Sequence, residues 1–258
     1  MRLRTQFLTE NRCYRAGRRI KPKGVMIHST GANNPKVCRY VPGDNELGHN
    51  TGNNHWNRIT TEVCVHAFIG NFGDGSVGTV QTLPWDYRAS HCGGSGNNTH
   101  ISFEVCEDDL TDASYFNAVY QEAVELTAFL CQVYELDPLS PGVVICHAEG
   151  YKRGVASNHG DVQHWFPRHG KTMDDFRADV ARVMEVPDMT RDDLKAMVRE
   201  VLAEIEAEKA TLPPSSWATE LLADAKKKGI TDGTRPRSTA TREEVAIMVR
   251  AAVDKNRH

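Results

Sequence analysis

The sequence predicts an α/β fold, with a mixed central β-sheet flanked by helices and a small helical module at the C-terminal end. Two observations lead to this prediction. Short apolar runs of strand length are interspersed with segments of helical periodicity over the first part of the chain, which is typical of a sheet covered by helices. The pattern breaks at Pro187, and the periodicity after it is helical only. The chain of 258 residues therefore has room for one sizeable core and a second, smaller unit.

The strand candidates are apolar runs bounded by glycine or small polar residues. They are residues 24–28, 63–69, 78–83, 100–105 and 142–146. The clearest helix covers residues 115–134, where apolar side chains recur at helical spacing, and a closing helix covers residues 173–184. The segments 31–57 and 90–99 are rich in glycine and asparagine and are longer than ordinary connections, so we expect them to form the walls of a site.

The chain divides by pattern into three regions. Residues 1–187 form the first domain, residues 188–212 an amphipathic helical linker, and residues 213–258 a helical module. In the module, Thr241 and Glu244 fit a capping box at the start of the last helix. The linker carries an apolar stripe at helical spacing, which would pack on the first domain or against a second copy of itself. The stripe consists of Leu194, Met197, Val198, Val201, Leu202 and Ile205.

The composition is that of an ordinary globular protein, with 40% hydrophobic and 25% charged residues. A net charge of −3 gives no reason to expect a nucleic-acid partner, and the basic first 23 residues are predicted to be a solvated arm. No run approaches the ~18–20 apolar residues of a membrane span, and the N-terminus lacks the apolar core of a signal peptide. Seven cysteines without a Cys-x-x-Cys pair suit reduced thiols. We therefore expect cytoplasmic synthesis and no membrane partner.

The stretch from His147 to Asp161 places two imidazoles and a carboxylate within fifteen residues, and a third imidazole, His28, ends the first predicted strand. Imidazole and carboxylate are both zinc ligands, and a catalytic zinc typically takes three protein ligands and keeps a position for water. Zinc lowers the pKa of that water towards ~7. The residues thus predict one catalytic Zn²⁺. Other side chains could replace Asp161 geometrically, namely His159, His164 and Cys146.

Four motifs in a fixed order carry a resemblance to a known family. They are His28 in Ile-His-Ser-Thr, Glu104 in Ile-Ser-Phe-Glu-Val, His147 in Cys-His-Ala-Glu-Gly and Asp161 in Asn-His-Gly-Asp. Together they resemble the marker positions of the type 2 zinc N-acetylmuramoyl-L-alanine amidases, a superfamily that includes many phage endolysins and the animal peptidoglycan-recognition proteins. The resemblance extends to about residue 180. It implies hydrolysis of the bond between N-acetylmuramic acid and L-alanine in peptidoglycan, with His28, His147 and Asp161 as ligands of one Zn²⁺.

The resemblance also implies roles around the metal. Glu104 matches a catalytic glutamate, and the alternative is a buried acid paired with an arginine. His159 matches a position that is Lys or His in relatives and stabilises the oxyanion, the alternative being a histidine that orders the loop. His91, in Ala-Ser-His-Cys-Gly-Gly, resembles the segment that lines the substrate groove. Asn50 and Trp56 are candidates for substrate contact, although solvated loop residues are the preferred interpretation for both.

The C-terminal module resembles a single S-layer-homology repeat. The resemblance rests on Gly-Ile-Thr-Asp-Gly at residues 229–233 and Ala-Thr-Arg-Glu-Glu at residues 240–244. Such repeats usually occur in threes and bind secondary wall polymers. With one repeat present, the expected partners are a secondary cell-wall polymer or a second copy of the chain in a homodimer.

Two alternatives to a lytic amidase follow from the same residues. The first is a non-catalytic peptidoglycan-binding module, which shares the fold but lacks a complete metal set. The second is a recycling amidase that acts on soluble muropeptides, which would not need a wall-binding tail. The preferred interpretation is an endolysin-like enzyme, made in the cytoplasm and released to the cell wall by a holin or by cell lysis.

Overall fold

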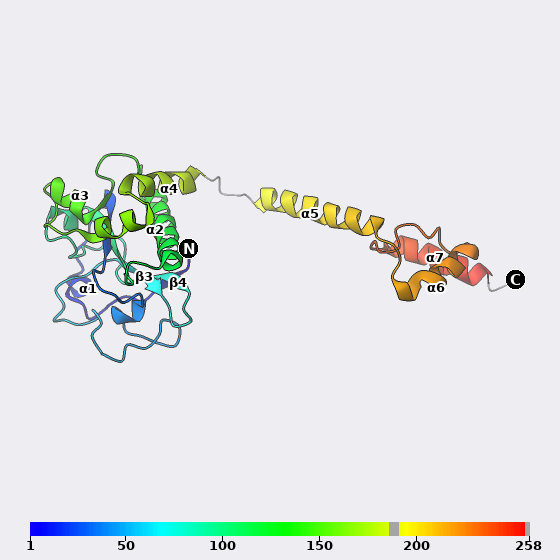
Figure 1. Cartoon of the computed structure of the whole chain (residues 1–258), viewed down its shortest axis with the longest axis horizontal. Helices are drawn as coiled ribbons and strands as arrows, with labels where there is room; N and C mark the ends of the chain where they lie inside the picture. Colours follow the sequence, from blue (N-terminus) through cyan, green and yellow to red (C-terminus); the bar gives the residue numbers. More distant parts are fainter. Residues whose placement is uncertain (186–190, 256–258) are drawn as a thin grey trace. The chain divides into compact units, whose positions relative to one another are not determined.

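The computed structural model of the chain describes residues 1–185 and 191–255, and within the helix that begins at residue 191 it describes side chains from residue 195 onward. The predicted boundary at Pro187 and the side chain of Leu194 lie outside the described residues. The chain divides into two compact units, Met1–Val186 and Pro187–His258 (Figure 1). Within the described part, no helix combines the length and the apolar character needed to cross a bilayer.

A six-stranded sheet forms the centre of the first unit, in the order β1-β4-β3-β5-β2-β6. Strand β2 runs parallel to β5 and β6, and β3 runs parallel to β5 but antiparallel to β4. The sheet is therefore mixed, which confirms the predicted fold class. The strands are β1 (Leu3–Thr5), β2 (Gly24–Ser29), β3 (Ala67–Asn71), β4 (Val77–Gln81), β5 (His100–Val105) and β6 (Val144–Cys146).

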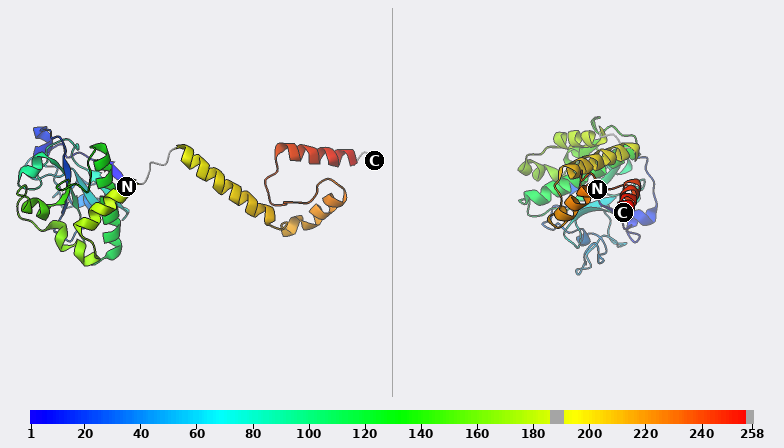
Figure 2. Two further views of the ribbon diagram at one scale, coloured as in Figure 1. Left: turned by 90° about the horizontal axis from the view of Figure 1, so that it is seen from above. Right: turned by 90° about the vertical axis from the view of Figure 1, so that its right-hand side faces the viewer.

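Long helices cover one face of this sheet. Helix α2 (Ala113–Val133) packs on the strands and against α4 (Met173–Glu185), as Figures 1 and 2 show. Their apolar side chains share the largest core with alternate strand residues, among them Ile27 of β2 and Phe103 of β5. Because successive strand residues point to opposite faces, the even-numbered residues of β2 and β5 point away from α2.

The opposite face of the sheet is covered by the long segment 31–57 rather than by long helices. Phe68 of β3 packs there in a second core with Tyr40 and Leu47. His28 and Glu104 belong to this face, so the site described below lies between the sheet and the loops. Shorter elements complete the unit: α3 (His147–Lys152) and the 3₁₀ turns η1 (Val37–Arg39), η2 (Ser95–Asn98), η3 (Asp161–His164) and η4 (Phe166–His169).

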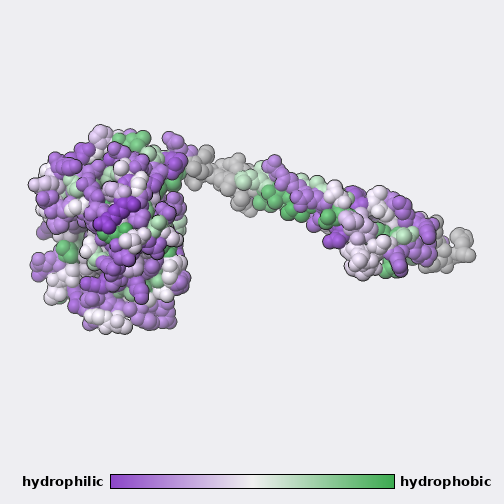
Figure 3. Space-filling model, in the orientation of Figure 1, coloured by the Kyte–Doolittle hydropathy of each residue, from purple (hydrophilic) through white to green (hydrophobic). Residues whose placement is uncertain are grey.

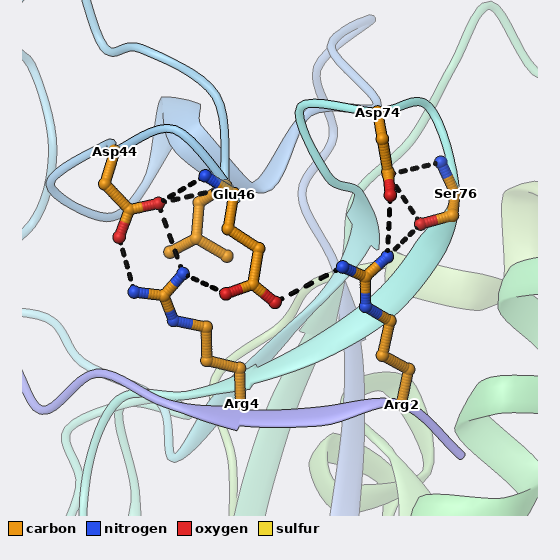
Figure 4. A network of polar contacts seen from close by, with 7 residues as sticks. Arg2, Arg4, Asp44, Glu46, Asp74 and Ser76 are labelled. Atoms are coloured by element: carbon orange, nitrogen blue, oxygen red, sulfur yellow. Dashed lines mark hydrogen bonds and ion pairs between the residues drawn. The ribbon is translucent and has the colours of Figure 1, made fainter.

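The N-terminal segment is part of the folded unit, so the predicted solvated arm is wrong. Strand β1 pairs with β4, helix α1 (Arg12–Ala16) follows, and Leu8 between them is buried. Acids from two distant loops balance its positive charge, which a local count of charges cannot detect. Arg2 and Arg4 form ion pairs with Asp44, Glu46 and Asp74 (Figure 4).

Strand β3 begins at Ala67, four residues later than predicted. Before it, Cys64 forms only an isolated bridge with Ser90, and the ladders to β4 and β5 start at Ala67. The apolar run on which the prediction was based begins before the residues that pair with a strand on each side. The predicted strand therefore starts too early. The other predicted strands, and both predicted helices of this unit, are confirmed to within two residues at each end.

The second unit is helical. It contains α5 (Arg191–Thr211), the 3₁₀ turn η5 (Ser216–Ala218), α6 (Thr219–Lys227) and α7 (Arg242–Lys255). The predicted capping box before α7 is present. The Thr241 hydroxyl accepts from the Glu244 N–H at 3.1 Å, and the Glu244 carboxylate accepts from the Thr241 N–H at 2.8 Å.

Candidate active site and metal centre

The candidate residues gather where three parallel strands end. His28 is the last residue but one of β2, Glu104 is the last but one of β5, and His147 follows β6 as the first residue of α3. His28 and Glu104 are also paired in the β2–β5 register. The carboxyl ends of parallel strands meet at one edge of a sheet, which is where α/β proteins usually form sites.

Three side chains bring their donor atoms together at this edge, namely His28, His147 and Asp161. The two Nδ1 atoms are 3.1 Å apart, and Asp161 Oδ2 lies 3.2 Å from His28 Nδ1 and 2.9 Å from His147 Nδ1. Zinc ligands at ~2.0–2.1 Å from a tetrahedral ion lie about 3.3 Å from one another. The three distances fit a single ion with slightly contracted spacing.

The hydrogen bonds of the two imidazoles fit a cation at the same point. His28 Nε2 lies 2.9 Å from His91 Nδ1, and His147 Nε2 lies 3.2 Å from the Ser157 hydroxyl oxygen. If each Nε2 carries the ring proton and donates to these acceptors, both Nδ1 atoms present lone pairs towards the Asp161 carboxylate. Three acceptors facing one another repel unless a cation lies between them. The donor set is therefore suited to zinc.

Asp161 reaches this cluster through an unusual backbone. Its φ of 44° is in the left-handed region, which costs free energy for a residue other than glycine. Burial alone would raise the pKa of Asp161, but the close contacts of its carboxylate with the His147 and His28 rings outweigh burial and hold the pKa below the usual range. The turn η3 thus presents an ionised carboxylate to the two imidazoles.

Glu104 is the acid next to this cluster. His28 of β2 and Phe68 of β3 flank it in register. Its Oε2 is buried, and none of the described residues donates a hydrogen bond to it or pairs with it as an arginine would. Burial raises the pKa of Glu104 well above its usual range, and the negative charge of Asp161 raises it further. Such a carboxyl group is suited to general acid–base chemistry.

His159 lies at the exposed rim of the cluster. Its ring centroid is 4.7 Å from that of His147, and its Nδ1 is 3.1 Å from the Ser157 hydroxyl oxygen. Ser157 therefore touches both imidazoles, and it also lies 3.2 Å from the carbonyl oxygen of Cys92. The sequence prediction did not include Ser157, because a serine in a loop carries no spacing signal.

His91 lies against His28, with ring centroids 5.1 Å apart in an edge-to-face arrangement. Its own backbone N–H donates to Asn97 Oδ1 at 2.9 Å. Burial lowers the pKa of His91 well below its usual range, and the neighbouring His28 lowers it further. A neutral ring in this position can accept from His28 and fix its orientation. Contact of His91 with substrate stays a prediction.

Asn50 and Trp56 take part in the packing of the long loop. The Asn50 amide donates to the carbonyl oxygen of Cys38 at 2.6 Å, and Asn50 lines an open cavity of about 320 Å³. Trp56 packs edge-on against Phe68, with ring centroids 5.0 Å apart. Both are held by protein contacts rather than being solvated loop residues, and their contact with substrate stays a prediction.

The other side chains considered as third ligand lie elsewhere. Cys146 shares the core beneath α2, on the sheet face opposite to His28, because strand residues alternate between faces. His164 Nε2 is directed to Glu107, 2.9 Å away. Neither belongs to the donor cluster that the described residues form.

Glu107 is a site residue that the sequence prediction missed. It follows β5, is 3% exposed, and pairs with His164. His164 ends the turn η3 that begins with Asp161, so this close contact links the turn that carries Asp161 to the end of β5. Nothing in the local sequence Glu-Val-Cys-Glu distinguishes Glu107 from a solvated acid.

His66, the residue before β3, is a buried core histidine. Its Nδ1 accepts from the Ser102 N–H at 3.0 Å and its Nε2 donates to the Tyr87 carbonyl at 2.8 Å. Burial lowers the pKa of His66 to about 4. Both ring nitrogens are satisfied within the protein, so the ring is not one of the three donors gathered at His28, His147 and Asp161.

Comparison with known proteins gives a family and a fold. A family model described as N-acetylmuramoyl-L-alanine amidase matches residues 18–168. A span of that extent contains the three donor residues and Glu104, and leaves the second unit outside. No curated protein sequence matches the chain.

Several solved structures share the fold. The Staphylococcus aureus hydrolase AmiA in complex with its ligand is 19% identical, with a TM-score of 0.53, over 71% of this chain and 82% of AmiA. The catalytic domain of PlyG is 19% identical, with a TM-score of 0.50, over 73% of this chain and 98% of that domain. A mutant of PlyL is 20% identical, with a TM-score of 0.50, over 70% and 99% of the two chains.

Proposed function

The chain belongs to the N-acetylmuramoyl-L-alanine amidase family, and on that premise we propose that it is a zinc-dependent enzyme. Its proposed reaction is hydrolysis of the amide bond between N-acetylmuramic acid and L-alanine in bacterial peptidoglycan. The observation that carries the proposal is the convergence of His28 Nδ1, His147 Nδ1 and Asp161 Oδ2 to within 3.2 Å of one another. Glu104 lies in register with His28 on the same sheet face.

His28, His147 and Asp161 would hold the zinc ion. When bound, zinc polarises the scissile carbonyl and lowers the pKa of water at the site. His91 and Ser157 accept from the outer nitrogens of the two imidazoles, which fixes the ring orientations and the tautomers. The chain thus supplies both the ligands and the contacts that orient them.

Glu104 would move the proton that hydrolysis requires. Its carboxylate takes a proton from the attacking water as the water oxygen bonds to the lactyl carbonyl carbon. Glu104 then gives that proton to the nitrogen of L-alanine as the carbon–nitrogen bond breaks. The products are a free lactyl carboxylate on N-acetylmuramic acid and a stem peptide with a free amino terminus. The buried, unpartnered Oε2 supports this role.

His159 would stabilise the negative charge that develops on the carbonyl oxygen. Its exposed ring stands beside His147, so a protonated imidazole at this position would be close to the reacting carbonyl. A positive charge placed before the reaction begins is an effective way to stabilise an oxyanion.

We also propose a lytic context. The enzyme would be made in the cytoplasm and reach the cell wall after release by a holin or by cell lysis, as an endolysin does. All seven cysteines are free and buried, which suits synthesis in a reducing compartment. Expression in a susceptible host should leave cells intact until a holin is co-expressed, whereas lysis without any pore-forming partner would contradict this context.

The decisive experiment is mass spectrometry of purified peptidoglycan after digestion with the zinc-loaded protein. We expect unsubstituted N-acetylmuramic acid and stem peptides that begin with free L-alanine, and far less of these products from Glu104→Gln in the same time. Walls that bind the protein and stay chemically intact would indicate a non-catalytic module. Cleavage confined to soluble muropeptides would indicate a recycling amidase.

A further inference from the structure

The second unit exposes many large apolar side chains. None of the side chains described in it is buried, and Trp217, Leu221 and Ile247 are 78%, 67% and 68% exposed. A small unit normally depends on its own apolar core for stability. Apolar surface left outside in this amount marks an interaction surface.

Helix α5 carries the most regular part of this surface. Five apolar side chains along it are 40–56% exposed, namely Met197, Val198, Val201, Leu202 and Ile205. They form a band along one side of the helix, green in Figure 3. Val198, Val201 and Ile205 follow the alternating spacing of three and four residues; the next two positions are Glu208, which is polar, and Leu212, which lies just past the end of α5. This spacing is the heptad pattern of a coiled coil.

We propose that α5 pairs with α5 of a second copy of the chain as a short, parallel two-stranded coiled coil. The pattern places Val198 and Ile205 at position a and Val201 at position d. The seam is self-complementary, because the same apolar positions face one another across a two-fold axis.

The residues that flank the seam fit this parallel arrangement. In a parallel pair, a g residue meets the e residue five positions later on the partner helix. Met197 of one copy would then meet Leu202 of the other, and Glu204 would meet Lys209. Apolar side chains meet apolar ones and an acid meets a base, so the flanks agree with the seam in register and direction.

A second copy fits this face better than a lipid surface does. Helices that lie on membranes carry lysine and arginine on the polar face, whereas here Glu200, Glu204 and Glu206 lie outside the apolar seam. Because Glu208 interrupts the seam, we expect a dimer that dissociates on dilution. Two linked catalytic units would bind a polymeric substrate more tightly than one, without any new contact.

Sedimentation equilibrium of the full chain over a range of concentrations tests the proposal. The 28.8 kDa chain should approach twice this mass at high concentration. The double variant Val201→Glu/Ile205→Glu should remain monomeric, because two charges enter the seam. The matched control, Ala203→Glu, adds a charge to the same helix away from the seam and should keep the dimer.

The direction of pairing has its own test. Glu204→Lys should weaken the dimer, and adding Lys209→Glu should restore it, since both copies then regain an opposite-charge pair. Val198→Cys should form a disulfide between copies under mild oxidation, whereas Ala203→Cys should not. A full chain that stays monomeric at every concentration overturns the proposal, as does a dimer that survives Val201→Glu/Ile205→Glu.

A wall-binding occupant gives a different result. A monomeric chain that sediments with purified walls through these same apolar residues would show that the wall, and not a second copy, covers them. The sedimentation experiment measures the mass of the assembly and does not depend on catalytic activity. Cleavage of soluble muropeptides by Val201→Glu/Ile205→Glu should stay at the level of the unchanged chain, so failure of the dimer and failure of the amidase proposal are distinguishable.

Discussion

His28 and Glu104 are register partners on adjacent parallel strands, and both point to the sheet face away from α2. One residue supplies a metal donor and the other an unpartnered carboxyl group. Because the β2–β5 ladder sets their separation, no loop has to close to bring the two groups together. A site built on strands in this way keeps its geometry more accurately than one built on loops.

The first prediction concerns Glu104. Glu104→Gln should keep zinc and lower turnover by about 10²–10⁴-fold, the usual scale of general acid–base catalysis. Thermal unfolding should occur at the same temperature or higher, because the change removes an ionisable group that has no partner. Turnover on purified walls, zinc content and calorimetry measure the three effects. The control is Glu62→Gln, which changes an exposed acid paired with Arg12 and should leave turnover unchanged. Near-normal turnover of Glu104→Gln would show that the Glu104 carboxyl group has only a structural role.

The second prediction concerns the ligand set. His28→Ala, His147→Ala and Asp161→Ala should each lose zinc and activity, because each removes one of three donors. Asp161→Cys should retain zinc, since a thiolate is also a zinc ligand. Elemental analysis after dialysis measures the metal content.

The controls for the ligand set are side chains close to it in sequence. Cys146→Ala should keep zinc, because Cys146 lies on the other face of the sheet. His159→Ala should keep zinc and lose turnover. If His159→Ala loses the metal and Asp161→Ala keeps it, His159 is the third ligand and Asp161 is not.

The third prediction concerns the contact between Glu107 Oε1 and His164 Nε2, which lie 2.9 Å apart. Glu107→Gln should weaken zinc binding by about 10–100-fold, the usual cost of losing a contact that positions a metal ligand. His164→Gln should do the same, and the double variant should cost little more than either single one. Competition with a fluorescent chelator measures the affinity. Additive losses in the double variant would show that the two side chains act independently.

The fourth prediction concerns pH. The pKa of His66 is about 4 in the folded chain against 6.5 for the free side chain, so the unfolded state binds more protons between these values. The free energy of unfolding should therefore fall as the pH falls from about 6.5 towards 4, and the His66 contribution is fully present above pH 6.5. The loss over the whole window is about 3 kcal/mol.

Urea unfolding at pH 7.5 and pH 5 measures this effect for the unchanged chain and for His66→Gln, which lacks the titrating group and should show the shallower dependence. Nuclear magnetic resonance of His66 gives an independent check in the unchanged chain. A midpoint near the usual histidine value would remove the physical basis of the prediction.

The sequence alone was enough to predict the fold class, most element positions and the metal-site candidates. Apolar periodicity depends on local spacing, so β5 and α2 are visible without any knowledge of their neighbours. His28, Glu104, His147 and Asp161 were found because their motifs occur in a fixed order.

Tertiary structure decided what depends on residues far apart in the chain. The positive charges of Arg2 and Arg4 are balanced by acids that lie 40 or more residues away in the sequence. Glu107 became part of the site because a turn 57 residues later places His164 against it. Cys146 and His147 are adjacent in sequence, yet Cys146 at the end of β6 points into the core and His147 points to the donor cluster. Contacts of this kind depend on strand order and register, which are set by packing across the whole sheet and leave no trace in local spacing.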